Sequence, residues 1–103
     1  MKKALKMTLM VDGKEKTFTE RFIPAAKILD ALDLISADVN QPMANIITDR
    51  VNFLANVFTD EEVTEKLIWE GFNALDFDNQ TFNLICEVAG VDPKNIPTEP
   101  VKE

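Results

Sequence analysis

The sequence predicts a mostly helical α+β fold, an N-terminal β-hairpin followed by about four helices. An Asp12-Gly13 pair separates two segments of alternating apolar and polar residues, and this dipeptide favours a two-residue type I′ turn because that turn needs positive φ. After Pro24 the apolar residues recur at helical spacing instead. A chain of 103 residues has the size of one domain. We expect this domain to cover residues 1–91, and the proline-containing segment 92–103 to form a flexible tail.

The predicted turn fixes the register of the hairpin. If Asp12 and Gly13 occupy the turn, Met7 lies opposite Phe18. One face then carries the apolar residues Leu5, Met7, Leu9, Val11, Phe18 and Phe22. The other face carries the polar residues Lys6, Thr8, Glu15, Thr17, Thr19 and Arg21. Because two strands alone are only marginally stable in water, we expect helices to cover the apolar face.

Prolines mark the starts of the first two predicted helices. Pro24 suits the first turn of a helix that continues to about Ala37, and Pro42 opens the second helix. The stripe of the first helix is Ile28, Leu29, Leu32 and Ile35. The stripe of the second helix, which we expect at the centre of the core, is Met43, Ile46, Ile47, Val51, Leu54, Val57 and Phe58.

Capping residues mark the last two predicted helices. Thr59-Asp-Glu-Glu62 has the pattern of a capping box and predicts the start of the third helix. Gly71 is expected to end that helix in the left-handed conformation. Asp78 is expected to cap the fourth helix and Gly90 to end it. The inner face of the fourth helix is predicted to be Phe82, Ile85, Cys86, Val88 and Ala89.

The composition argues against several classes of function. The chain has no histidine and one cysteine, Cys86, so we expect no catalysis and no metal site. Its three glycines are accounted for by one turn and two helix ends, which leaves none for a phosphate-binding loop, and we expect no cofactor. The net charge of −7 argues against nucleic-acid binding. The longest apolar run is too short to span a membrane, and we expect a soluble cytoplasmic protein.

Residues 1–27 hold seven Lys and Arg against three Asp and Glu, whereas residues 28–103 hold four against fifteen. This asymmetry suits either simple solubility or contact between the basic hairpin of one copy and the acidic helices of another.

Two regions are candidates for partner binding. A two-stranded hairpin exposes unpaired backbone groups on both outer edges, which invites another chain to pair with it. We therefore single out the hairpin residues Met7, Leu9 and Phe18. Trp69 and Phe72 lie at the predicted junction of the third and fourth helices, where they form either ordinary core or a binding patch, since Trp is enriched among interface hot spots.

Four segments in order resemble the tail assembly chaperones of long-tailed phages and prophages of Gram-positive bacteria. They are the hairpin 6–18, the helix entry 22–27, the segment 57–62 and the helix break at Gly71, and the resemblance spans residues 5–91. It implies an acidic, mostly helical, non-catalytic protein that coats the tape measure protein, keeps that protein soluble and helps to recruit subunits of the major tail protein. By position, the two candidate regions above are our predicted sites of self-association or partner contact, and we expect a homo-oligomer that acts in the cytoplasm of the bacterial host.

Two other classes of function stay open at this point. One is a structural head–tail connector, or an oligomeric adaptor, of a phage particle. The other is an acidic mimic of DNA, which suits the net charge but suits the basic N-terminal region less well.

Overall fold

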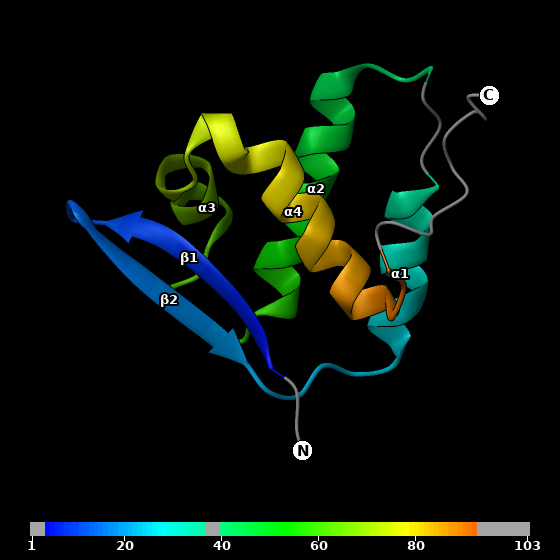
Figure 1. Ribbon diagram of the computed structural model, residues 1–103, viewed down its shortest axis with the longest axis horizontal. Helices are drawn as coiled ribbons and strands as arrows, with labels where there is room; N and C mark the ends of the chain where they lie inside the picture. The colour runs from blue at the N-terminus through cyan, green and yellow to red at the C-terminus, as the bar shows by residue number, and fades with distance from the viewer. Residues whose placement is uncertain (1–3, 37–39, 93–103) are drawn as a thin grey trace.

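A computed structural model describes residues 4–36 and 40–92 and has the predicted order, an N-terminal antiparallel hairpin followed by four helices (Figure 1). The elements are β1 (Leu5–Val11), β2 (Lys14–Glu20), α1 (Ala26–Ile35), α2 (Met43–Val57), α3 (Glu65–Gly71) and α4 (Ala74–Ala89). The predicted end of the first helix at Ala37 and the predicted tail beyond residue 92 lie outside the described residues.

The hairpin has the predicted turn and register. Asp12 and Gly13 have φ angles of 53° and 81°, as a type I′ turn requires. Met7 lies opposite Phe18 across the two strands. On the polar face, the hydroxyl groups of Thr8 and Thr17 lie 2.8 Å apart in a cross-strand hydrogen bond. The dipeptide at residues 12 and 13 was therefore sufficient to predict the pairing.

The apolar face of the hairpin packs on the helices, except at its last predicted member. Its buried residues are Leu5, Met7, Leu9 and Phe18, each at most 4% exposed. Burying each such side chain stabilises the fold by about 1.5–3 kcal/mol. Phe22 was predicted to share this face, and this is wrong, because its side chain is 74% exposed. β2 ends at Glu20, so the alternation of the strand does not continue to residue 22.

The four helices pack together against the apolar face of the hairpin, and α4 crosses in front of α2 (Figure 1). α3 and α4 pack against β1, and α1 packs against α4 and α2, at the side of the molecule away from the hairpin (Figure 1). α2 supplies the centre of the core, as predicted, although Met43 at its start is 53% exposed. The buried apolar residues of the helices and of the loop between α2 and α3 are Ala31, Val51, Phe53, Leu54, Val57, Phe58, Val63, Ile68, Leu84, Ile85 and Cys86.

The capping box predicted at Thr59–Glu62 is wrong. α3 begins after Thr64, whose hydroxyl oxygen accepts a hydrogen bond from the N–H of Leu67 at 3.1 Å. The segment before it forms a turn, in which the N–H of Val63 donates to the carbonyl of Asp60 at 2.9 Å. This turn places Val63, which is 5% exposed, in the core before the helix starts.

The cap predicted at Asp78 is also wrong. α4 is capped five residues earlier, where the side chain of Asn73 accepts a hydrogen bond from the N–H of Leu75 at 2.9 Å. Asp78 instead binds Arg50 of α2, with 2.7 Å between Nη1 and Oδ1. The same nitrogen donates to the hydroxyl of Thr81 at 3.2 Å. The buried Arg50 guanidinium therefore joins α2 to α4, and we call this contact the Arg50 bridge.

Gly71 ends α3, but not in the left-handed conformation that we predicted, because its φ is not positive. Its role is close packing. A Cβ atom at residue 71 would lie 2.9 Å from Cβ of Leu9 and 3.1 Å from the carbonyl oxygen of Met10. Gly90 does end α4 in the left-handed region, with φ of 77°. The two helix-ending glycines thus serve different needs, contact at residue 71 and backbone conformation at residue 90.

Candidate partner-binding surfaces

The structure separates the five residues that we singled out for partner binding. Met7, Leu9 and Phe18 are at most 3% exposed and pack under the chain's own helices. Trp69 is 48% exposed, and Phe72 is partly buried at the end of α3. Trp69 can therefore meet a partner without any rearrangement, whereas the three hairpin residues could do so only if the hairpin left the helices. Whether any of the five contacts a partner stays a prediction.

Trp69 is held in place by a small aromatic cluster, which we call the Trp69 corner (Trp69, Phe72 and Phe77). Trp69 stacks on Phe77 of α4, with ring centroids 6.2 Å apart and planes within 5°. Phe72 meets the same ring edge to face at 5.5 Å. Two further exposed apolar residues lie on the neighbouring elements, Met10 of β1 (49% exposed) and Leu75 of α4 (91% exposed). A rigid, half-exposed Trp with apolar neighbours is typical of an interface residue.

The largest departure from our sequence prediction is on α1. We predicted that Ile28, Leu29 and Leu32 face the core, but they are 39%, 68% and 39% exposed. These three residues span about 100° of the helix circumference, and we call them the α1 face. The residues that face inward are Ile35, as predicted, together with Ala31 and Leu34.

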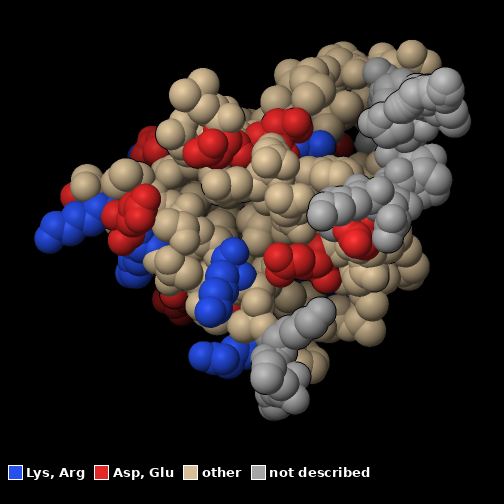
Figure 2. Space-filling model, viewed as in Figure 1, with Lys and Arg blue, Asp and Glu red and all other residues tan. Residues whose placement is uncertain are grey.

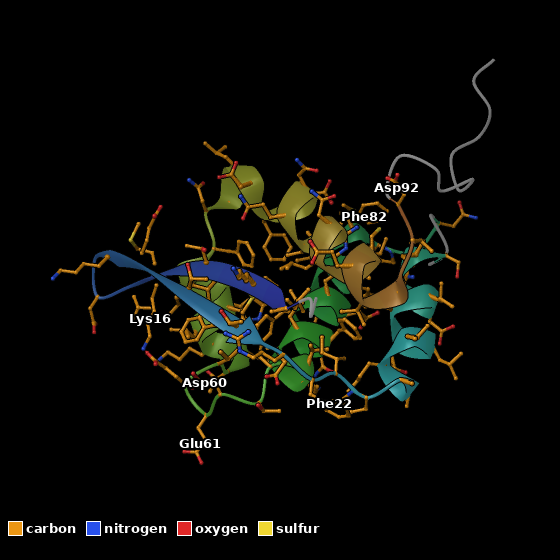
Figure 3. All side chains as sticks on the ribbon, turned by 60° about the horizontal axis from the view of Figure 1, so that its bottom comes forward. Lys16, Phe22, Asp60, Glu61, Phe82 and Asp92 are labelled. Atoms are coloured by element: carbon orange, nitrogen blue, oxygen red, sulfur yellow. The ribbon has the colours of Figure 1, made fainter. Side chains whose placement is uncertain are left out.

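The composition of α1 carries a signal for this surface that we missed. The helix is apolar around most of its circumference. Because α4 and α2 cover only one side of α1, apolar residues on its other side stay exposed. Phe22, on the linker that leads into α1, extends the apolar surface towards the hairpin (Figure 3). Exposed apolar residues of this kind make the α1 face a candidate binding site for another protein.

The edges of the hairpin differ from each other. α3 and α4 lie beside β1, whereas β2 is the outermost strand (Figure 1). Among the described residues, β2 is covered only from beneath, by the loop between α2 and α3. There the carboxylate of Glu20 accepts hydrogen bonds from the N–H and the hydroxyl of Thr59, at 2.8 and 2.9 Å. Within residues 4–36 and 40–92, no backbone hydrogen bond joins either outer edge of the hairpin to another segment.

The distribution of charge differs between the hairpin and the helices. Lys and Arg side chains gather over the hairpin, whereas Asp and Glu dominate the helices (Figure 2). Beneath β2, Lys16 forms an ion pair with Glu62, and Asp60 lies beside the pair (Figure 3). The hydrogen bond from Lys16 to Glu62 raises the pKa of the lysine above its ordinary value. The Nζ atom of Lys16 also lies 5.3 Å from the centre of the Phe18 ring.

A groove runs between the base of the hairpin and the end of α4. Its volume is about 960 Å³. Its lining includes basic residues (Lys6 and Arg21), acidic residues (Glu20, Glu87 and Asp92) and apolar residues such as Ile23 and Val88. This mixed lining identifies no ligand.

The described part of the chain offers no sign of a metal centre or of a membrane span. In that part no group of three or more metal-ligating side chains could hold an ion. No helix in it is both long and apolar enough to cross a bilayer. The burial of Cys86 raises the pKa of its thiol.

These observations define a small α+β domain with exposed apolar surfaces, a type suited to binding other proteins. The chain matches the family of phage tail chaperone proteins over residues 2–103, and it belongs to that family. Membership supports a role in phage tail assembly, with tail proteins as partners in general. No curated protein and no solved structure matched the chain.

Proposed function

We propose that this protein binds the tape measure protein during phage tail assembly, keeps it soluble, and helps to recruit subunits of the major tail protein. Its place of action would be the cytoplasm of the bacterial host. Two findings support this function, membership of the tail chaperone family and the α1 face. The α1 face carries the proposal, because a stable monomer rarely leaves one side of a helix apolar and exposed.

The α1 face has the geometry that an amphipathic client helix needs. Ile28 and Leu32 are one helical turn apart, and Leu29 lies beside them on the same side. An apolar stripe of this length can pack along the apolar side of another helix. The acidic helical body around it would keep the complex soluble through its net negative charge.

The Trp69 corner is the second proposed contact. Trp69 and Phe72 sit at the other end of the group of helices from α1 (Figure 1). Separate apolar surfaces would allow one copy to hold the client through α1 and another tail protein, or another copy, through Trp69. We further propose that the protein works as a homo-oligomer, in which the hairpin residues Met7, Leu9 and Phe18 act by holding the hairpin in place.

The test is co-expression with the tape measure protein of the same phage genome. The measurement is the fraction of tape measure protein that stays in the supernatant after centrifugation. We expect the wild-type chaperone to keep the client soluble and L29E to lose this effect, because a carboxylate on the α1 face opposes apolar packing. M43E is the matched control, since Met43 is also exposed but lies at the start of α2, outside both proposed contacts.

Circular dichroism of both variants establishes that they are folded. The proposal fails if the client precipitates equally with and without the wild-type protein. The assignment of the α1 face fails if M43E abolishes solubility as fully as L29E does. W69A, tested by capture of the major tail protein on the soluble complex, examines the second contact in the same way.

A further inference from the structure

We propose that β2 is the self-association surface of this protein, and that it pairs antiparallel with β2 of a second copy to form a four-stranded sheet. This inference rests on the proposed homo-oligomer and names its interface. It begins from the backbone groups that the hairpin leaves unpaired.

The register identifies these groups. In an antiparallel pair, residues alternate between hydrogen-bonded and non-hydrogen-bonded positions, and the pair that flanks a two-residue turn is hydrogen-bonded. That pair is Val11 and Lys14. Glu15, Thr17 and Thr19 of β2 are therefore at non-hydrogen-bonded positions, and their N–H and C=O groups point away from β1. The Thr8–Thr17 hydroxyl contact agrees with this assignment, because side chains approach most closely at such positions.

The outer edge of β1 is closed. On that strand the outward groups belong to Lys6, Thr8 and Met10. The end of α3 blocks the outward N–H and C=O groups of Met10. A Cβ atom added at Gly71 would lie 3.1 Å from the Met10 carbonyl oxygen and 3.4 Å from the Met10 nitrogen, so no other chain fits there. A chain could not reach the full length of this edge. None of the helices in the described part of the chain packs along β2 (Figure 1), so β2 is the edge that can accept a strand.

A second copy of β2 suits this edge because the strand is complementary to itself. β2 runs from Lys14 to Glu20, and its midpoint is Thr17. Full overlap about a two-fold axis at Thr17 places outward groups opposite outward groups, so that they exchange hydrogen bonds. The pairs across the axis are Thr17 with Thr17, Lys16 with Phe18, Glu15 with Thr19, and Lys14 with Glu20.

Charge and the length of the overlap together select this register over its neighbours. At full overlap each end of the interface pairs Lys14 of one copy with Glu20 of the other, and no like charges face each other. A shift of the axis to residue 16 places Lys16 opposite Lys16, and a shift to residue 15 places Lys14 opposite Lys16. Like charges directly opposite each other destabilise a sheet. A shift of the axis to residue 18 places Lys16 opposite Glu20, but it leaves Lys14 and Glu15 without partners in β2, so that five residues of each strand pair instead of seven.

In the single copy, Lys14 and Glu20 are already placed to form the charged pair between copies. Thr59 holds the carboxylate of Glu20 through two hydrogen bonds, at 2.8 and 2.9 Å, so its position is fixed before association. Lys14 is exposed beside the hairpin turn. The apolar faces of both hairpins lie on the same side of the joined sheet, where each copy's own helices and loop already cover them.

A cysteine scan tests the register directly. In the full chain, T17C should form a disulfide-linked dimer under mild oxidation, because hydrogen-bonded cross-strand Cα atoms lie about 5.5 Å apart, within the range of a disulfide. T19C is the matched control. Its two copies would be about 13 Å apart along the strands and should not link. Cys86 is buried in both variants and should not interfere.

Sedimentation equilibrium tests the edge itself. T17P removes an outward N–H and should yield a monomer, whereas T8P breaks the same Thr8–Thr17 contact on β1 and should remain dimeric. K14E should weaken the dimer about tenfold because it faces Glu20 in both halves. The double variant K14E/E20K restores opposite charges and should recover association.

Three results would overturn the inference: a wild-type protein that is monomeric at all concentrations, a dimer that T17P leaves intact, or equal linkage of T17C and T19C. These failures are distinct from failure of the chaperone function. If monomeric T17P still keeps the tape measure protein soluble, client binding stands without the strand pairing. If T17C links and the client precipitates, the strand pairing stands alone.

Discussion

The two strands of the hairpin have the same length and pair along it, yet the fold uses them differently. β1 buries Leu5, Met7 and Leu9 at alternate positions and lies against α3 and α4. β2 buries Phe18 as its one fully covered residue, and its other side chains are polar. β1 is thus a structural strand of the core, while β2 is attached to the molecule mainly through β1. A strand held in this way can present its outer edge without weakening the core.

The largest expected change in stability comes from two residues that lie opposite each other across the hairpin. Leu9 of β1 lies opposite Lys16 of β2. L9A should lower the free energy of unfolding by about 2–5 kcal/mol, because it leaves a cavity in the core. K16A should have little effect, since the exposed Lys16–Glu62 pair is screened by water. Urea denaturation measures both, and equal losses would remove the distinction between the strands.

The next effect tests how closely α3 approaches β1. G71A should lower the free energy of unfolding by about 1–3 kcal/mol, because the added Cβ would lie 2.9 Å from Cβ of Leu9. E70A, one residue earlier at an exposed position, is the control and should change stability little. A stable G71A protein would mean that the β1 edge has room for another chain.

A smaller effect compares the supports beneath the two strands. T64A removes the cap of α3, which packs against β1, and should cost about 1 kcal/mol. T59A, beneath β2, should cost less, because the backbone N–H of Thr59 still donates to Glu20. Thermal unfolding measures the loss of stability in both variants. A larger loss in T59A than in T64A would indicate that Thr59 caps the helix, as the sequence predicted.

The smallest effect is the dependence of stability on alkaline pH. Burial raises the pKa of Cys86 in the folded protein, so the unfolded thiol ionises first. The free energy of unfolding should therefore be constant below the ordinary pKa of 9.0 and should fall as the pH rises past it. Lys16 also has a raised pKa, and its contribution should be lost only above 10.5.

Denaturant curves from pH 7 to 11 measure the alkaline loss. C86A should remove the loss that begins near the ordinary thiol pKa of 9.0, while K16A should leave it in place. An unchanged alkaline loss in C86A would show that other groups cause it.

Local signals predicted the hairpin well and the helix starts less well. Asp12-Gly13 determines a turn through the φ angles it favours, so the pairing of both strands followed from two residues. Thr59 and Thr64 are both plausible caps, and the choice between them depends on burying Val63, which is a tertiary requirement. In the same way, Asp78 has an alternative partner in Arg50, which lies 28 residues away in the sequence.

The binding surfaces were harder to predict because exposure depends on what the rest of the chain covers. The apolar residues of α1 have helical spacing on more than one side, and spacing alone does not say which side faces inward. Glycine at residue 71 was expected for its conformational freedom, whereas it is required for contact with Leu9. Trp69 was recognised from its residue type, and its stacking on Phe77 came from the fold.

The Arg50 bridge has a consequence for the integrity of the molecule. It joins α2 to α4 across the intervening segment that contains α3, through bonds from one guanidinium nitrogen to Asp78 and Thr81. A protease that cuts the exposed loop at Glu61 would therefore not release a fragment. The two halves should stay together as a nicked particle, held by this contact and by the hairpin packed across the cut.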